Sequence, residues 1–126
     1  MIKAPLSVVV GNKSVPISLN HYRNGYHHQL NKAKVLYKKC MADQLKGLIL
    51  VPPVALLFIY FAPDKRIRDL GNMLAIHEKY FSDALVELGC LPDDSYEYIN
   101  EIVYRFGSID KLNPRVEISI KSNLGI

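Results

Sequence analysis

The chain has few cysteines and no cysteine motif. Cys40 and Cys90 form neither a CxxC pair nor a zinc-ligand spacing, so the two thiols are expected to be reduced. Seven glycines and seven prolines in 126 residues exclude collagen-like and low-complexity classes. The start does not resemble a signal peptide, because Lys3 is followed by Pro5 rather than by a long apolar run. We therefore expect an intracellular, cytoplasmic protein.

A membrane-spanning helix is also not expected. Residues 47–63 carry no charge, but this length is at the lower limit of a span, and Pro52 and Pro53 in its middle would break a helix. The sequence instead predicts a turn at the prolines, followed by a fully buried strand at 54–61. We expect no membrane partner.

The composition is that of one globular domain. The chain has a mass of 14.3 kDa, with 49% hydrophobic and 22% charged residues, which suits a single core over 1–126. Apolar runs on both sides of Gly11 predict a hairpin, and the polar residues 20–31 predict a loop. Apolar residues at helical spacing predict two main helices. The predicted elements are strands at 7–10 and 15–18, helices at about 31–46 and 70–88, and strands at 54–61, 99–106 and 115–120. We expect the last two strands to be antiparallel. The order ββ-α-β-α-ββ predicts an α+β (mixed α/β) domain with its helices packed on a mixed sheet.

Charge is distributed unevenly along the chain. Residues 1–46 hold eight Lys or Arg against one acid, whereas residues 69–103 hold eight acids against one Lys. A basic chain with clustered acids fits a nucleic-acid partner and a cation site. Chance clustering on solvated faces is the alternative.

Three acids flank the second main helix. Asp69 lies at its start, and Asp93 and Asp94 follow its end. If the loop after Gly89 folds back along the helix, Asp94 lies beside Asp69, and the two would favour Mg²⁺ or Mn²⁺. The alternatives are that Asp69 only caps the helix and that Asp93 and Asp94 form an ordinary turn.

Two polar segments are candidates for phosphate contacts. One is the basic run 65–68, and the other is the loop 20–28, which is rich in His, Tyr and Asn. The alternatives are a solvated edge for the basic run, as is usual for short charge runs, and a polar surface loop for 20–28. His27 and His28 lack the spacing to a third ligand that a metal site needs.

Five segments in one order resemble the RusA family of Holliday junction resolvases, which are common in phages and prophages. They are SLNHYR at 18–23, KAKVLY at 32–37, PDKRIRDLGN at 63–72, KYFSDAL at 79–85 and PDD at 92–94. The resemblance covers about residues 18–120. It implies a homodimeric, Mg²⁺-dependent endonuclease that cuts four-way DNA junctions by paired incisions.

The resemblance also implies site residues. The family site has a stretch Asp-x-Asp-Asn, and Asp69 and Asn72 match its first Asp and its Asn. Lys79 matches a Lys that the family has on the following helix. Asp94 matches an Asp from a later Asp-Asp pair. Gly71 stands where the family has its second Asp. We hypothesise that Glu78 replaces this carboxylate; the alternative is a solvent-facing Glu. Lys79 is alternatively an i, i+4 partner of Asp83.

The sequence thus predicts a structure-selective DNA endonuclease. Asp69, Asp94 and Asp93 would hold the metal, with Lys79 and Glu78 assisting catalysis. The residues expected to contact DNA are Asn20, His21, Arg23, Lys32, Lys34, Lys65, Arg66, Arg68 and Asn72. The alternatives are a RusA-like protein that binds branched DNA or a host protein without cutting, and an interaction module that shares only the fold.

Overall fold

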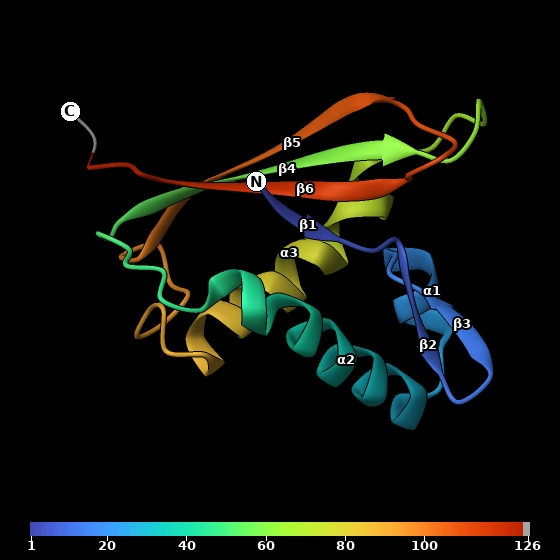
Figure 1. Cartoon of the computed structure of the whole chain (residues 1–126), viewed down its shortest axis with the longest axis horizontal. Coiled ribbons are helices and arrows are strands. Elements are labelled where there is room, and N and C mark those ends of the chain that lie inside the picture. Colours follow the sequence, from blue (N-terminus) through green and yellow to red (C-terminus); the bar gives the residue numbers. More distant parts are fainter. Residues whose placement is uncertain (125–126) are drawn as a thin grey trace.

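The computed structural model describes residues 1–124 and combines a mixed four-stranded sheet, a separate hairpin and two main helices (Figure 1). This confirms the predicted α+β class. The elements are β1 (Ile2–Ala4), β2 (Ser7–Val10), β3 (Lys13–Pro16), α1 (Leu19–Asn24), α2 (His27–Leu45), β4 (Val54–Ala62), α3 (Leu70–Glu87), β5 (Ile99–Ile109) and β6 (Arg115–Ser122). No helix among the described residues has the length and apolar character needed to cross a bilayer.

The sheet has the strand order β1-β6-β4-β5. β4 is the central strand, parallel to β5 and antiparallel to β6. The prediction that the last two strands are antiparallel is right in direction, but they do not pair with each other, because β4 lies between them. The uncharged run 54–61 suits this position, since a strand paired on both sides is the most deeply buried.

The segment predicted as a polar loop at 20–31 is helical instead. α1 covers its first part, residues 20–24, and α2 already begins at His27. Ser18 caps α1, its Oγ accepting a hydrogen bond from the backbone N–H of His21 at 3.3 Å. The polar composition concealed α1 because the helix is only six residues long and has no buried residue.

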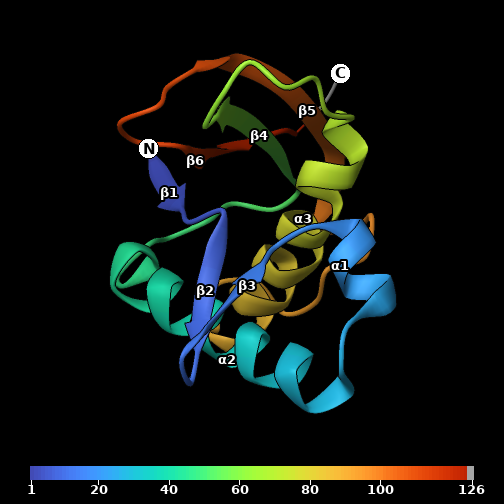
Figure 2. The same cartoon turned by 90° about the vertical axis from the view of Figure 1, so that its right-hand side faces the viewer.

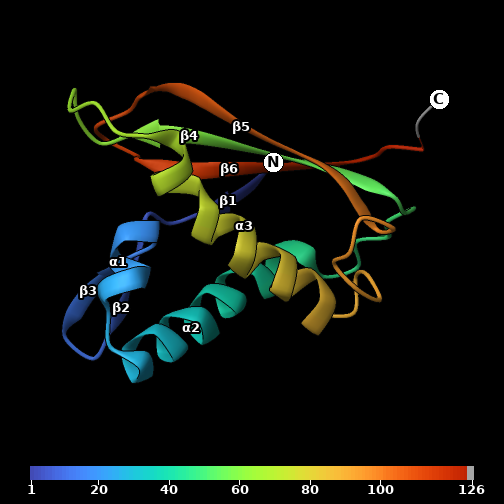
Figure 3. The ribbon, with the colours of Figure 1, turned by 180° about the vertical axis from the view of Figure 1, so that it is seen from behind.

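α3 packs between the sheet and α2 (Figure 3). Its Phe81 meets Phe58 of β4 edge to face, with the ring centroids 5.9 Å apart. On its other side, Tyr37 of α2 contacts His77 and Tyr80. All of these side chains are almost fully buried, so this aromatic layer forms the centre of the core.

The hairpin of β2 and β3 lies against α2, next to α1 (Figure 2). Its turn contains Gly11, whose φ of 66° is in the left-handed region that glycine adopts without strain. This confirms the hairpin predicted from the sequence. The helices all lie on one side of the four-stranded sheet, and among the described residues no helix covers its other face (Figure 1).

Candidate nucleic-acid interface

Three chain segments meet at the N-terminal end of α3. They are α1, the connection 63–69 that follows β4, and the first turn of α3. The backbone N–H of Asn20 donates to Oδ1 of Asn72 at 2.8 Å, which ties α1 to α3. Asn24 in turn donates to the carbonyl oxygen of Asn20 at 2.8 Å, which fixes the outer face of α1.

These segments, together with apolar residues such as Leu6 and Ile17 from the hairpin region, line a cavity of about 450 Å³ that also presents polar and basic side chains. Five residues predicted from the sequence to contact DNA share this cavity: Asn20, His21, Arg66, Arg68 and Asn72. The Nε2 atom of His21 is buried and has no hydrogen-bond partner among the described residues. The cavity therefore offers donors from three separate segments to one ligand.

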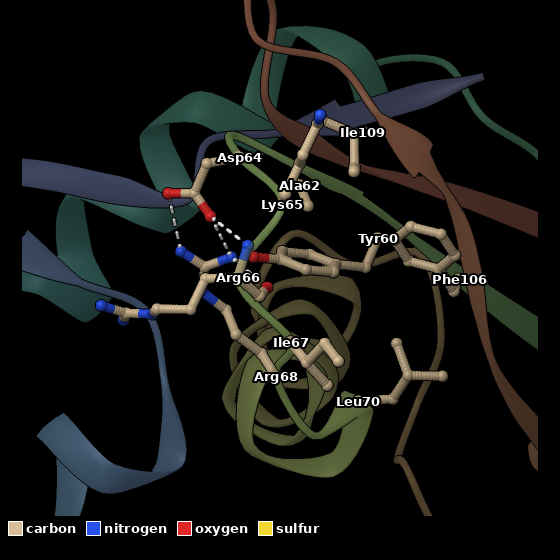
Figure 4. Close-up of a pocket in the computed structure, with 10 residues that line it drawn as sticks. All are labelled: Tyr60, Ala62, Asp64, Lys65, Arg66, Ile67, Arg68, Leu70, Phe106 and Ile109. Atoms are coloured by element: carbon tan, nitrogen blue, oxygen red, sulfur yellow. Dashed lines mark hydrogen bonds and ion pairs between the residues drawn. The ribbon is translucent and has the colours of Figure 1, made fainter.

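The two arginines of the cavity differ in their surroundings. Arg68 binds Asp64 through its Nη1 at 2.9 Å, and its side chain is only 13% exposed (Figure 4). Asp64 raises the pKa of the Arg68 guanidinium, and in return Arg68 and the backbone N–H of Arg66 lower the pKa of Asp64. Arg66 is exposed and has no ion pair among residues 1–124. Arg66 is therefore the freer of the two positive charges.

A second cavity of about 280 Å³ adjoins the first and shares Tyr60, Arg66 and Arg68 with it (Figure 4). Burial raises the pKa of the Tyr60 hydroxyl. Lys65 lines this second cavity from the connection. Sequence reasoning missed Tyr60, because it belongs to a strand whose pattern indicates only burial, and it missed Asn24, which differs in no way from its polar neighbours.

Asp69 is exposed at the entrance to α3. It occupies the N-cap position, but its side chain makes no capping hydrogen bond, so the capping alternative is not what the structure shows. Its carboxylate therefore remains available for another partner.

Asp93 and Asp94 lie at the far end of α3 from Asp69. α3 has 18 residues, which separates its ends by about 27 Å at ~1.5 Å per residue. The loop after Gly89 does not fold back along the helix. It continues to Tyr98, whose carbonyl oxygen accepts from the N–H of Val54 at the start of β4, whereas Asp69 follows the end of β4. The expected pocket of Asp69 and Asp94 within one chain is therefore wrong.

Glu78 also does not complete a site with Asp69. It lies nine residues further along α3, about 13 Å at ~1.5 Å per residue, and its carboxylate accepts a hydrogen bond from the Tyr104 hydroxyl of β5. Burial, followed by this hydrogen bond, raises the pKa of Tyr104 well above its usual value. The hypothesis that Glu78 replaces the carboxylate missing at Gly71 is not supported by this geometry.

Lys79 is exposed on α3, and its suggested partner Asp83 binds Lys34 instead, at 2.9 Å. Asp83 is the main cause of the raised pKa of Lys34. Lys34 therefore faces α3 in this structure, and its predicted contact with DNA stays a prediction. A second pair, Lys38 with Glu87 at 2.9 Å, shows that part of the charge asymmetry serves to join α2 to α3.

The remaining predicted DNA contacts are dispersed. Arg23 is exposed on α1, near the cavity in sequence. Lys32 lies on α2 beside Val9 and Val35, in a hollow at the hairpin that shares no residue with the two cavities described above.

Among residues 1–124, no group of three or more His, Cys, Asp or Glu side chains is close enough to hold an ion. The Mg²⁺ or Mn²⁺ that the family resemblance implies stays a prediction. In the comparisons with known proteins, no family model matches the chain, and no curated protein is significantly similar to it.

Proposed function

We propose that this chain is a metal-dependent, structure-selective DNA endonuclease of the RusA type, which resolves Holliday junctions or other branched DNA. It would act in the cytoplasm, which is the cytoplasm of the bacterial host if a phage encodes the protein. The observation that carries the proposal is the convergence of Asn20, Arg66, Arg68 and Asn72 in one cavity at the end of α3 where Asp69 is exposed. These residues are up to 52 positions apart in the chain.

The chemistry of the cavity suits a DNA backbone. Guanidinium groups bind phosphate through several N–H donors, and side-chain amides and backbone N–H groups add neutral donors. The start of α3 contributes the positive end of its dipole at the same place. A cavity built from such donors reads the position of phosphates rather than the identity of bases, which is the property that recognition of a branched structure requires.

Cleavage also requires that acidic side chains lie close enough together to bind one metal ion. Because Asp69 and Asp94 lie at opposite ends of α3, one ion can bind both only if two chains contribute to its site. We therefore propose a homodimer in which Asp69 of one chain faces Asp94, with Asp93, of the other. A two-fold axis then creates two equal sites, as paired incisions in a junction require.

A second function is favoured by the surroundings of Gly71 and Glu78. The carboxylate that the family has at position 71 is absent, and Glu78, the residue suggested to replace it, accepts a hydrogen bond from Tyr104. A chain of this kind would bind branched DNA without cutting it. The basic cavity serves both functions equally, so only cleavage distinguishes them.

The test is a labelled synthetic four-way junction, compared with a linear duplex of the same sequence, with and without Mg²⁺. We expect the wild-type chain to nick the junction only with Mg²⁺. Asp94→Asn is expected to abolish nicking while keeping junction affinity, whereas the control Asp43→Asn, an exposed acid on α2, keeps both. Junction binding without any nicking would support the second function, and equal affinity for both DNAs would contradict structure selectivity.

The cavity is tested separately by binding. We expect Arg66→Ala to weaken junction affinity by roughly tenfold, as the loss of a phosphate contact does at low salt. The control Lys46→Ala removes an exposed charge just past the C-terminal end of α2. If both variants weaken binding equally, the cavity is not the DNA site.

A further inference from the structure

β5 leaves a long edge of the sheet unpaired. The strand order puts it at one edge and the three-residue β1 at the other. β5 has eleven residues, and all except Ile99 and Tyr104 are exposed. Among them are Ile102, Val103 and Phe106, which are 39%, 37% and 50% exposed. Such an edge presents N–H and C=O groups that can pair with another strand.

β5 lacks two common means by which natural proteins block an edge strand. It contains neither Pro nor Lys, the two residues most often used to block an edge. Its pairing with β4 shifts register near each end, between Val54 and Ala55 and between Tyr60 and Phe61, and is regular between these shifts, from Glu101 to Phe106. A regular segment with apolar side chains on an open edge is suited to receive a strand.

The two sides of this segment are chemically different. Glu101, Val103 and Arg105 line one hollow on the sheet face away from α3. Tyr104 points to the other face, where it donates to Glu78 of α3. An added strand must therefore match a charged row on one face and an apolar row on the other.

A second copy of β5 meets this requirement. In an antiparallel pair related by a two-fold axis, one residue faces its own copy, and directly opposed side chains share a face. With Val103 on the axis, Glu101 of each copy lies opposite Arg105 of the other, giving two ion pairs. With Ile102 or Tyr104 on the axis, Glu101 would face Val103 or Gly107, and both ion pairs would be lost.

Neither of these two residues forms an ion pair within the part of the chain that the structure describes. Among residues 1–124, Glu101 has only a 3.5 Å contact with the amide of Asn123, and Arg105 has no ion pair. We propose that two copies of this chain join through β5, antiparallel and with Val103 facing Val103, to form one continuous sheet. The interface does not depend on nuclease activity.

The antiparallel arrangement also has a consequence for the proposed function. Only this consequence, and not the dimer itself, rests on that function. β5 starts at the Asp94 end of the molecule and ends beside the connection that leads to Asp69, since Ile109 and Leu70 line one cavity. Reversing the partner strand brings the Asp94 end of one copy toward the Asp69 end of the other.

Cross-linking tests the register. In a chain whose exposed Cys40 and half-buried Cys90 are both changed to Ser, Val103→Cys places two thiols opposite each other. We expect mild oxidation to give a disulfide-linked dimer. The control is Leu112→Cys, whose native side chain is 99% exposed in the connection to β6. If the control forms as much covalent dimer as Val103→Cys, the proposed register is wrong.

Charge reversal tests the ion pairs by sedimentation. Glu101→Arg and Arg105→Glu each oppose like charges twice, so each is expected to raise the dimer dissociation constant about tenfold or more. The double variant restores the pairs and the wild-type constant. Asp43→Arg, an equal change of charge on exposed α2, is expected to leave it unchanged. A monomeric wild-type chain, or a double variant as weak as the single ones, would overturn the proposal. A stable dimer that cuts no junction would instead overturn the nuclease activity alone.

Discussion

His77 illustrates how one buried side chain sets the response of the fold to acid. Its ring is fully buried on α3, its Nδ1 lies 2.9 Å from the Tyr37 hydroxyl, and its Nε2 has no hydrogen-bond partner among the described residues. Burial lowers the pKa of His77 to about 3. In an unfolded chain the pKa of histidine is about 6.5. Between these two values the unfolded chain binds a proton that the native chain does not.

The free energy of unfolding should therefore fall as the pH falls through this window. One proton of difference is worth about 1.4 kcal/mol per pH unit, so between pH 7 and 5 the loss from His77 is about 2 kcal/mol. We expect His77→Phe to remove this part of the loss, although the unpaired Tyr37 hydroxyl lowers its stability at both pH values. Urea unfolding of wild type and variant at pH 7 and pH 5 measures the free energy of unfolding at each pH and its change with pH. An unchanged pH difference in the variant would contradict the assignment.

At the same scale, the sequence identified the residues that line the cavity, but it did not predict where the acidic side chains lie relative to one another. Arg66, Arg68 and Asn72 are close in sequence, so any fold that starts a helix near residue 70 keeps them together. The distance from Asp69 to Asp94 depends instead on the path of the loop after Gly89, which no local pattern specifies. Glu78 was misjudged for a similar reason, because its partner Tyr104 belongs to a strand distant in sequence.

At the scale of elements, Gly25 joins α1 to α2 in a space that a larger residue cannot enter. A Cβ at this position would lie 2.9 Å from the carbonyl oxygen of His21 and 3.1 Å from Cδ2 of Leu30. Since the first of these atoms is backbone, α1 must shift to accommodate it. Gly25→Ala should cost about 1–3 kcal/mol of stability, the usual cost of overpacking.

Because α1 carries Asn20 and His21, the same shift should disturb the cavity. We expect Gly25→Ala to lower junction affinity even where the variant is fully folded by circular dichroism. Gly71→Ala is the matched control, because a Cβ there meets nothing within 4 Å. Equal junction affinities for the two variants would show that the position of α1 is irrelevant to binding.

The contact between α2 and α3 makes a second prediction at this scale. Lys34 and Asp83 are both partly exposed, so their ion pair should contribute less than about 1 kcal/mol. A double-mutant cycle of Lys34→Ala and Asp83→Ala in urea unfolding, repeated in high salt, measures this coupling. A coupling well above 1 kcal/mol, or one that salt leaves unchanged, would contradict a solvent-screened pair.

The long, periodic elements were predictable, and the short or topological features were not. α3 and β4 match their predicted ranges closely because periodicity and continuous burial are strong local signals. α1 was missed because six mostly polar residues give no such signal. β4 pairs with both β5 and β6 and separates them. Which strands pair with each other is not encoded in the strand sequences alone.

At the scale of the whole molecule, the cavity and the second acidic position lie at opposite ends. β4 has nine residues, so its ends are roughly 26 Å apart at ~3.3 Å per residue, and α3 spans a similar length beside it. Under the proposed function, the cavity and Asp94 of one chain are therefore too far apart to act on one phosphate. A second copy is needed to bring its own Asp94 end to that cavity.

Mixing two inactive variants tests this requirement most directly. Asp69→Asn and Asp94→Asn are each combined with the four-way junction and Mg²⁺, alone and after the two have been mixed at equal concentration and allowed to exchange. We predict no nicking by either variant alone, and in the mixture about one quarter of the wild-type number of intact sites, because each mixed dimer has one complete site. A mixture as inactive as its components, beside an active wild type, would contradict a site shared between two chains.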